Sequence, residues 1–491
     1  MHAYDRVRYR SVALPQLHPD RLATHARLFG LEPAPVAACR VLEVGCGDGA
    51  SLLPAAFALP ESTFVGIDIA PTPIAEGRAR AEAWGVSNLD LRALDLLDAG
   101  DLGTFDYVVA HGVYSWVPDA VREGLMALIA RCLAPQGVAF VSYNALPGGH
   151  LRRHTREMMQ YHIAGIDEPE RQVQQARALL DFVLDAQPAD SYYRVLLEKE
   201  RELSRAYTDQ HLFHDHLAEH NRPFYFHEVA EHAGRHGLRY LAEADFAAMQ
   251  DRTFPPATRV ALRQLEGDPI RREQMLDFLR NRLFRQTLLC RAEADAQWTP
   301  DPERVRSLTV AAPIRAVAED DGVTTFASAG GKSIRTGHPF AQAVCRTLGA
   351  QWPRATAFDA LHGAVSDDGD DGTLLAQMLL DFYADGFISL HAHAPALASE
   401  PSAQPEALPS ARREAEVGEV VTNGWHRAIP LDGVARRVVP LLDGTRDRSA
   451  LLAALAGANG VAEPVRAADL DGVLCRLAED ALLVAGEGAW G

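Results

Sequence analysis

The sequence has few cysteines and no long apolar run. Its six cysteines are scattered along the chain without a CxxC pair, which favours reduced thiols. No apolar run approaches the roughly 20 residues that span a bilayer, and residues 1–6 lack the apolar core of a signal peptide. We therefore expect a cytoplasmic protein without membrane insertion.

The chain also has fewer basic than acidic residues. Its net charge is −18 and its pI is about 5.5. A field of this sign repels phosphate backbones and disfavours nucleic acid as a partner. With 491 residues, of which 47% are hydrophobic, the composition predicts two to four globular domains.

Residues 40–148 alternate short apolar strands with helices. The alternation predicts an α/β domain with a parallel, Rossmann-like sheet, in which ligands bind at the carboxyl ends of the strands. The expected strands are residues 41–44, 64–69, 89–91, 107–110 and 138–143, and the expected helices are residues 51–59, 73–84 and 119–133.

The next segment is expected to leave this sheet and return to it. Residues 149–220 are polar and strand-free, which predicts a helical insertion. A helix at residues 225–234 and a strand at 238–241 indicate that residues 221–300 complete the sheet; the alternative is a separate helical domain. Residues 255–300 look helical.

The remaining segments flank this core. Residues 1–39 are expected to form an arm over the ligand. Residues 301–395 predict a winged-helix-like domain or another small α+β domain. Residues 396–413 are rich in Ala, Pro, Ser and Glu and predict a linker. Residues 414–491 predict a small, mostly helical domain.

A glycine-rich turn follows the first expected strand, with the spacing Gly45-x-Gly47-x-Gly49. Glycine lets the backbone approach a ligand closely and adopt positive φ. The acid Glu43 precedes the turn. A dinucleotide site does not need that acid, whereas a cofactor with a cationic methionyl end and no phosphate tolerates it. Asp68 ends the second strand, where a carboxylate can accept both ribose hydroxyls.

With this motif, residues 40–145 resemble the class I S-adenosylmethionine-dependent methyltransferases. The resemblance implies S-adenosylmethionine as cofactor, with the glycines under its methionyl part and ribose, and with Asp68 on the ribose hydroxyls. It also places the end of the fourth strand, at His111, opposite the methyl group. The cofactor contacts that we expect are Tyr9, Glu43, Gly45, Cys46, Gly47, Gly49, Asp68, Ile69, Asp95, Leu96 and His111.

A narrower resemblance rests on five further motifs. Residues 110–118, 142–150, 213–217, 223–228 and 438–446 are similar to bacterial methyltransferases that carry a methyltransferase regulatory domain. That family includes protein-lysine methyltransferases of bacterial outer-membrane proteins. The resemblance therefore implies a protein or peptide acceptor, with a lysine nitrogen as the atom methylated.

The acceptor is expected to meet residues just beyond the fourth and fifth strands. A lysine amine has a pKa near 10.4 and must lose a proton before it attacks, which desolvation or a nearby base can achieve. Aromatic faces can guide the amine or contact the sulfonium. For each candidate the alternative is a packed structural group. The candidates are His111, Tyr114, Trp116, Tyr143 and Asn144, with His150 as a further residue.

Histidines are crowded between residues 211 and 236. The pairs His216/His220 and His232/His236 have the i,i+4 spacing that can bind a metal on a helix. The run from His227 to His232 is not HExxH, however, and methyl transfer needs no metal. We therefore expect polar helix faces and no metal site. The acidic run at residues 367–372 lacks the spacing of a calcium loop and predicts a solvated turn.

Three functions remain open at this stage. The first is a methyltransferase acting on a protein or peptide, and the sequence is compatible with a homodimer. The second is a small-molecule methyltransferase whose helical insertion forms a lid. The third is a non-catalytic scaffold that binds S-adenosylmethionine.

Overall fold

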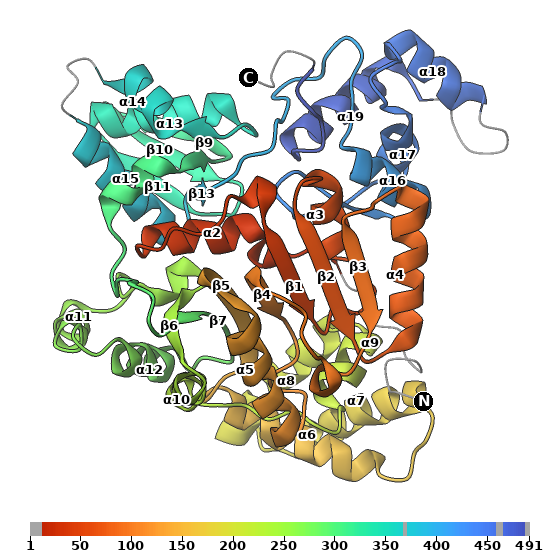
Figure 1. The fold of residues 1–491 in the computed structure, drawn as a ribbon, viewed down its shortest axis with the longest axis vertical. Helices are drawn as coiled ribbons and strands as arrows, with labels where there is room; N and C mark the ends of the chain where they lie inside the picture. The colour runs from red at the N-terminus through yellow and green to blue at the C-terminus, as the bar shows by residue number, and fades with distance from the viewer. Residues whose placement is uncertain (1–11, 367–370, 458–464, 487–491) are drawn as a thin grey trace.

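The computed structural model describes residues 12–366, 371–457 and 465–486 (Figure 1). In this part of the chain, the central sheet has seven strands in the order β3-β2-β1-β4-β5-β7-β6. Strands β1 to β5 are parallel, and β7 runs antiparallel to both of its neighbours. The strands are β1 (Arg40–Val44), β2 (Thr63–Asp68), β3 (Leu89–Ala93), β4 (Phe105–Ala110), β5 (Leu133–Asn144), β6 (Leu238–Glu243) and β7 (Phe284–Arg291).

Helices cover both faces of this sheet because its strands carry apolar side chains on both sides. Val41 packs with Phe29 on one face, whereas the next residue, Leu42, packs with Leu125 on the other. The predicted Rossmann-like sheet with a helical insertion is thereby confirmed. The covering helices are α2 (Pro19–Leu28), α3 (Leu52–Ala58), α4 (Pro71–Trp84), α5 (Asp119–Cys132), α10 (Phe226–Arg235) and α12 (Pro269–Arg280). Helix α11 (Pro256–Arg263) lies at the periphery, away from the strands (Figure 1).

The helical insertion lies at the carboxyl ends of the strands. Its amphipathic helices bury a small core of their own, which includes Met159 and Leu180. In Figure 1 the strands β1 to β3 point toward this insertion, while the C-terminal helices lie at the opposite end of the sheet. The insertion consists of α6 (Gly149–Ile163), α7 (Pro169–Asp185), α8 (Tyr192–Ala206), α9 (Asp209–His211) and the π-helical turn η4 (Leu212–His216).

Strand β7 was not predicted. Residues 255–300 were expected to be helical, but they form α11, α12 and then β7. The cause lies in the position of β7, which hydrogen-bonds to β5 on one side and β6 on the other. Thr287, Leu288 and Leu289 are almost fully buried there. The segment Phe284–Arg291 does not alternate polar and apolar residues, so its local pattern does not distinguish a buried strand from a piece of helix.

A second α/β unit follows the sheet and packs against α2. It contains β8 (Thr309–Ala311), β9 (Ile314–Asp320), β10 (Val323–Ser328), β11 (Ser333–Thr336), α13 (Pro339–Gln351), β12 (Thr356–Ala357), α14 (Phe358–Val365), α15 (Gly372–Ala384) and β13 (Ser389–His391). Most of the acidic run predicted as a turn lies outside the described residues.

The predicted linker at residues 396–413 is wrong. Leu397 and Ala407 are buried and form β-bridges with Val484 and Leu483. The segment then enters α16, whose Ala411 is also buried. Small apolar residues that suggest a linker by composition thus form part of a core. The C-terminal unit contains α16 (Pro409–Val417), β14 (Val420–Thr422), β15 (Ala428–Pro430), α17 (Gly433–Val438), α18 (Arg448–Gly457) and α19 (Ala467–Glu479).

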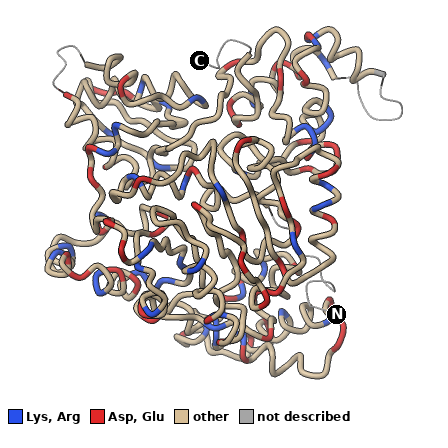
Figure 2. The backbone as a smooth tube through the Cα atoms, viewed as in Figure 1, with Lys and Arg blue, Asp and Glu red and all other residues tan. Residues whose placement is uncertain are grey.

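The described helices and the charged residues bear on the expected surroundings of the protein. No described helix has both the length and the apolar character that a bilayer crossing demands. Figure 2 shows basic and acidic residues dispersed together along the described chain.

Candidate active site at the carboxyl ends of the strands

The glycine-rich turn wraps from the end of β1 onto β2. The amides of Gly45 and Cys46 donate to the carbonyl oxygen of Ile67, at 2.8 and 3.2 Å. Gly45, Gly47 and Gly49 have φ of 76°, 56° and 70°, which disfavours any side chain. A Cβ on Gly45 would also lie 2.6 Å from Cγ2 of Val113. The turn therefore presents exposed backbone to a ligand.

The carboxylate of Asp68 is fixed at the end of β2 by backbone amides. Its Oδ2 accepts from the amide of Gly47 and its Oδ1 from the amide of Ala70, both at 2.8 Å. Each carboxylate oxygen has two acceptor sites, so each retains one for a ligand. Asp68 is half-buried. This geometry fits a pair of ribose hydroxyls.

Glu43 is a buried acid beneath the turn. It is 6% exposed, and its Oε2 has no hydrogen-bond partner among the described residues. Burial raises its pKa to about 8, and the nearby Asp68 and Asp48 add to the rise. A cationic group would relieve both the missing partner and the clustered negative charge. The donor and acceptor set around the turn therefore fits S-adenosylmethionine, whose methionyl end is cationic.

Three other expected cofactor contacts, Ile69, Asp95 and Leu96, follow the ends of β2 and β3. Ile69 is 46% exposed directly after β2, which leaves an apolar surface for a flat ring. Asp95 accepts from the amide of Leu97 at 2.9 Å, and Leu96 beside it is half-buried.

The structure does not support a side-chain contact with the cofactor for two of the predicted residues, Cys46 and Tyr9. The side chain of Cys46 is buried under Gly66, where an added Cβ would lie 2.7 Å from its Sγ. The thiol points into the core, so any contact of Cys46 with the cofactor is through its backbone and stays a prediction. Tyr9 lies outside the described residues.

His111 lies directly after β4 and faces the region beyond the glycine turn. Its Nδ1 is 3.0 Å from Oγ of Ser142, and that oxygen also accepts the amide of Gly112 at 2.9 Å. Its ring packs near Phe140 and Phe284. Burial lowers its pKa below the ordinary value. The imidazole is therefore neutral near pH 7 and able to accept a proton.

Tyr143 and Tyr114 are wrong as groups that contact the acceptor. Both are buried between the sheet and α5, in the same core cluster. The hydroxyl of Tyr143 is 2.9 Å from Oγ1 of Thr287, and that of Tyr114 is 2.8 Å from Nδ1 of His232. Successive strand residues face opposite sides of a sheet, so Tyr143 points away from the side that Ser142 and His111 share.

Three further candidates remain predictions. Asn144 is on the same side of β5 as Ser142, and its Nδ2 donates to Oδ1 of Asn221 at 2.7 Å. Trp116 is half-buried, and its indole N–H has no acceptor among the described residues. His150 is exposed at the start of α6, and its Nε2 is 3.2 Å from the hydroxyl of Tyr225.

Sequence reasoning missed the residues that surround His111. Ser142 could have been found from strand alternation, since it is two residues before Asn144. No local signal indicates Asn221 or Phe284, which come from distant segments.

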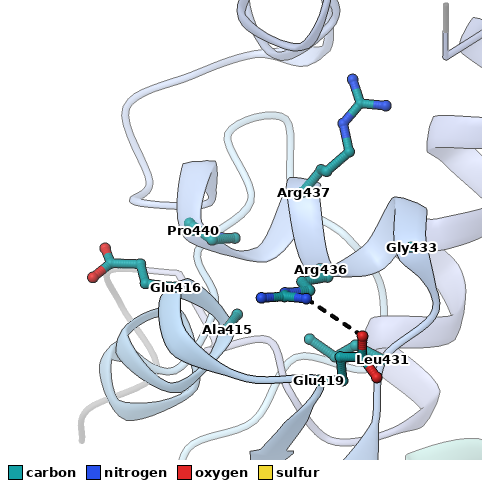
Figure 3. A pocket seen from close by; sticks show the side chains of 8 residues that line it. All are labelled: Ala415, Glu416, Glu419, Leu431, Gly433, Arg436, Arg437 and Pro440. Carbon is teal, nitrogen blue, oxygen red and sulfur yellow. Dashed lines mark hydrogen bonds and ion pairs between the residues drawn. The ribbon is translucent and has the colours of Figure 1, made fainter. Parts of the chain in front are cut away.

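A hollow on the C-terminal unit is separate from this site. It has a volume of about 440 Å³, and an ion pair of 3.4 Å joins Arg436 to Glu419 at its wall (Figure 3). It is lined by Ala415, Glu416, Glu419, Leu431, Gly433, Arg436, Arg437 and Pro440.

Comparison with known families matches three parts of the chain. Residues 42–139 match a methyltransferase domain, and residues 208–291 match a predicted methyltransferase regulatory domain. Residues 403–463 match the C-terminal winged helix domain of PKMT. This last match lies in the C-terminal unit, and the winged-helix-like assignment of residues 301–395 stays a prediction.

Comparison with individual proteins extends this result. The chain is 35% identical over 241 residues to the uncharacterized protein RP028 of Rickettsia prowazekii, covering 49% of this chain and 96% of that one. It is 38% identical over 289 residues to RP789 of the same organism, covering 58% of this chain and 52% of the relative. The chain therefore spans about half the length of RP789.

A solved structure resembles nearly the whole chain. PKMT2 from Rickettsia typhi, in complex with AdoHcy, has a TM-score of 0.86 and 26% identity, covering 97% of this chain and 100% of that one. The fold and the site define a class I S-adenosylmethionine-dependent methyltransferase. Within that class, the chain belongs to the family that carries a methyltransferase regulatory domain.

Proposed function

We propose that this protein transfers the methyl group of S-adenosylmethionine to a protein or peptide acceptor, at a lysine side-chain nitrogen. The observation that carries the proposal is the similarity to PKMT2 along 97% of the chain. It extends well beyond the catalytic sheet, and the winged-helix match at residues 403–463 adds to it.

The acceptor side of the site has the chemistry for this reaction. When bound, S-adenosylmethionine supplies a methyl carbon on a positively charged sulfur. The lone pair of a neutral amine forms the N–C bond while the C–S bond breaks, so a lysine must first be deprotonated. His111 can accept that proton, directly or through water, because burial keeps its imidazole neutral. If Nδ1–H is donated to Ser142, Nε2 is the free acceptor.

A small-molecule acceptor is the second candidate, and one observation favours it. The insertion and the segment after it cover the strand ends: Asn144 bonds to Asn221, and the amide of Arg222 donates to the carbonyl of Ser115 at 2.9 Å. Such a cover could act as a lid over a small substrate.

The test is to incubate the protein with a bacterial lysate and a methyl-labelled donor. We expect labelled protein bands and methyl-lysine in their hydrolysate. Asp68→Ala should abolish labelling because it removes the expected ribose contacts. Asp90→Ala is the matched control, since Asp90 is an exposed acid on the neighbouring strand. Label in small molecules alone would refute the protein acceptor, and label on another residue type would refute lysine.

A further inference from the structure

One group of metal-ligating side chains lies outside the methyl-transfer site. It joins α5 of the catalytic sheet to α10 of the regulatory segment and consists of Glu123, His232 and His236. One ligand atom of each lies within 4.8 Å of the others. We propose that this triad binds a divalent first-row metal ion, with Zn²⁺ the best fit, and that the ion clamps the two helices together.

The sequence spacing brings His232 and His236 together on α10, and the fold brings Glu123 of α5 next to them. His232 and His236 are four residues apart at the end of α10, so they lie on one face of the helix. Glu123 projects from α5 between them. Its Oε2 is 3.0 Å from Nε2 of His232, and its Oε1 is 2.8 Å from Nε2 of His236. Two histidines and a glutamate form an established zinc donor set.

The three ligand atoms lie within 4.8 Å of one another, so an ion would draw the two imidazoles and the carboxylate closer together. Zinc binds nitrogen and oxygen at about 2.0–2.2 Å, so two ligands of one tetrahedral ion are about 3.3 Å apart. The two carboxylate-to-imidazole distances already approach that value. The side chain of Glu123 is 58% exposed and free to adjust, whereas those of His232 and His236 are only 8% and 16% exposed. Water can complete the coordination on the exposed side.

The second nitrogen of His232 provides independent support. Ligating histidines almost always hydrogen-bond through their other ring nitrogen, which fixes the ring for the metal. Nδ1 of His232 is 2.8 Å from the hydroxyl of Tyr114. That hydroxyl can donate or accept, so it also suits the tautomer in which Nδ1 carries the hydrogen and Nε2 is free for the ion. Arg235 is a nearby positive charge, but Glu231 pairs with it at 3.8 Å.

The bound ion would fix the position of α10, in the regulatory segment, relative to α5 of the catalytic domain. It would take no part in methyl transfer itself. Tyr114 lies three residues after His111 and packs against Phe224. An ion that holds His232 in place would therefore hold the loop after β4, next to the proposed acceptor side. The proposal does not depend on the identity of the methyl acceptor.

The test uses the full chain, stripped with a chelator and dialysed. Zinc titration by calorimetry and metal analysis should give one bound Zn²⁺ per chain, and zinc should raise the melting temperature. Glu123→Gln and His236→Ala should each weaken zinc affinity about tenfold or more and reduce the thermal shift. Both are partly exposed positions, so the fold should survive, which circular dichroism checks.

His162→Ala is the matched control, because His162 is an exposed helix histidine away from the triad. It should bind zinc as the unmodified protein does. The proposal is overturned if the unmodified chain binds no zinc, or if Glu123→Gln and His236→Ala bind it as tightly as His162→Ala.

Discussion

The two halves of the active site differ in how the chain builds them. The cofactor half consists of Glu43, the turn at residues 45–49 and Asp68, and it comes from two adjacent strands and one turn. The proposed acceptor half around His111 uses β4, β5, β7 and the segment after the insertion. The cofactor half is local in sequence, whereas the acceptor half depends on tertiary structure. Local motifs are therefore enough to propose the cofactor half, whereas the acceptor half needs the fold.

The sharpest test of the acceptor half compares His111 with Tyr143, which the sequence treated alike. His111→Ala should lower kcat by about 10²-fold or more, because a positioned base contributes at least that factor. Tyr143→Phe should leave kcat unchanged and cost about 1 kcal/mol of stability, since its hydroxyl only bonds Thr287. Steady-state kinetics and denaturant unfolding measure the two effects. Equal losses of kcat in the two variants would contradict the assignment of His111 as the base and of Tyr143 as a structural residue.

The cofactor half can be tested by two glycines with the same backbone conformation. Gly45 and Gly85 have φ of 76° and 72°, so alanine costs about 1–2 kcal/mol at either position. Only at Gly45 does the added Cβ meet an atom, at 2.6 Å, whereas nothing lies within 4 Å at Gly85. Gly45→Ala should therefore weaken binding of S-adenosylhomocysteine about tenfold, and Gly85→Ala should not.

Calorimetry with S-adenosylhomocysteine gives both affinities, and thermal unfolding shows whether the two proteins lose stability equally. If both variants bind as the unmodified protein does, the turn does not contact the cofactor, and the cofactor half loses its basis.

A further test concerns the pH dependence of Glu43. Its pKa rises from 4.5 to about 8 on folding, so the folded state holds this proton more tightly than the unfolded state. The contribution of Glu43 to stability is therefore full below pH 4.5 and is lost as the pH rises toward 8. Glu43→Gln should flatten the stability profile between pH 4.5 and about 8, measured by denaturant unfolding.

The same acid should release a proton when a cationic cofactor binds. Calorimetry in two buffers of different ionisation enthalpy near pH 7 would show this release, and Glu43→Gln would abolish it. If Glu43→Gln releases as many protons on cofactor binding as the unmodified protein, the released proton comes from another group.

The sequence predicted the sheet because alternation and the glycine spacing are local signals. Asp68 and Ile69 follow from the end of β2 in the same way. Strand β7 could not be predicted, since its sequence lacks the polar and apolar alternation of a strand and the segment becomes one only through pairing with β5 and β6. Whether Tyr143 can contact the acceptor depends on which face of β5 is turned toward the acceptor. His111 bonds to Ser142 on one face, and Tyr143 lies on the other.

The position of β7 has a consequence for biosynthesis. This strand lies between β5 and β6, yet it is made after the whole insertion. While the chain emerges from the ribosome, one edge of β5 therefore stays unpaired until β7, which ends at residue 291, has been synthesised. An exposed edge strand invites pairing with other chains. A chain truncated after β5 should consequently aggregate, so the regulatory segment is part of the catalytic sheet and does not form a detachable module.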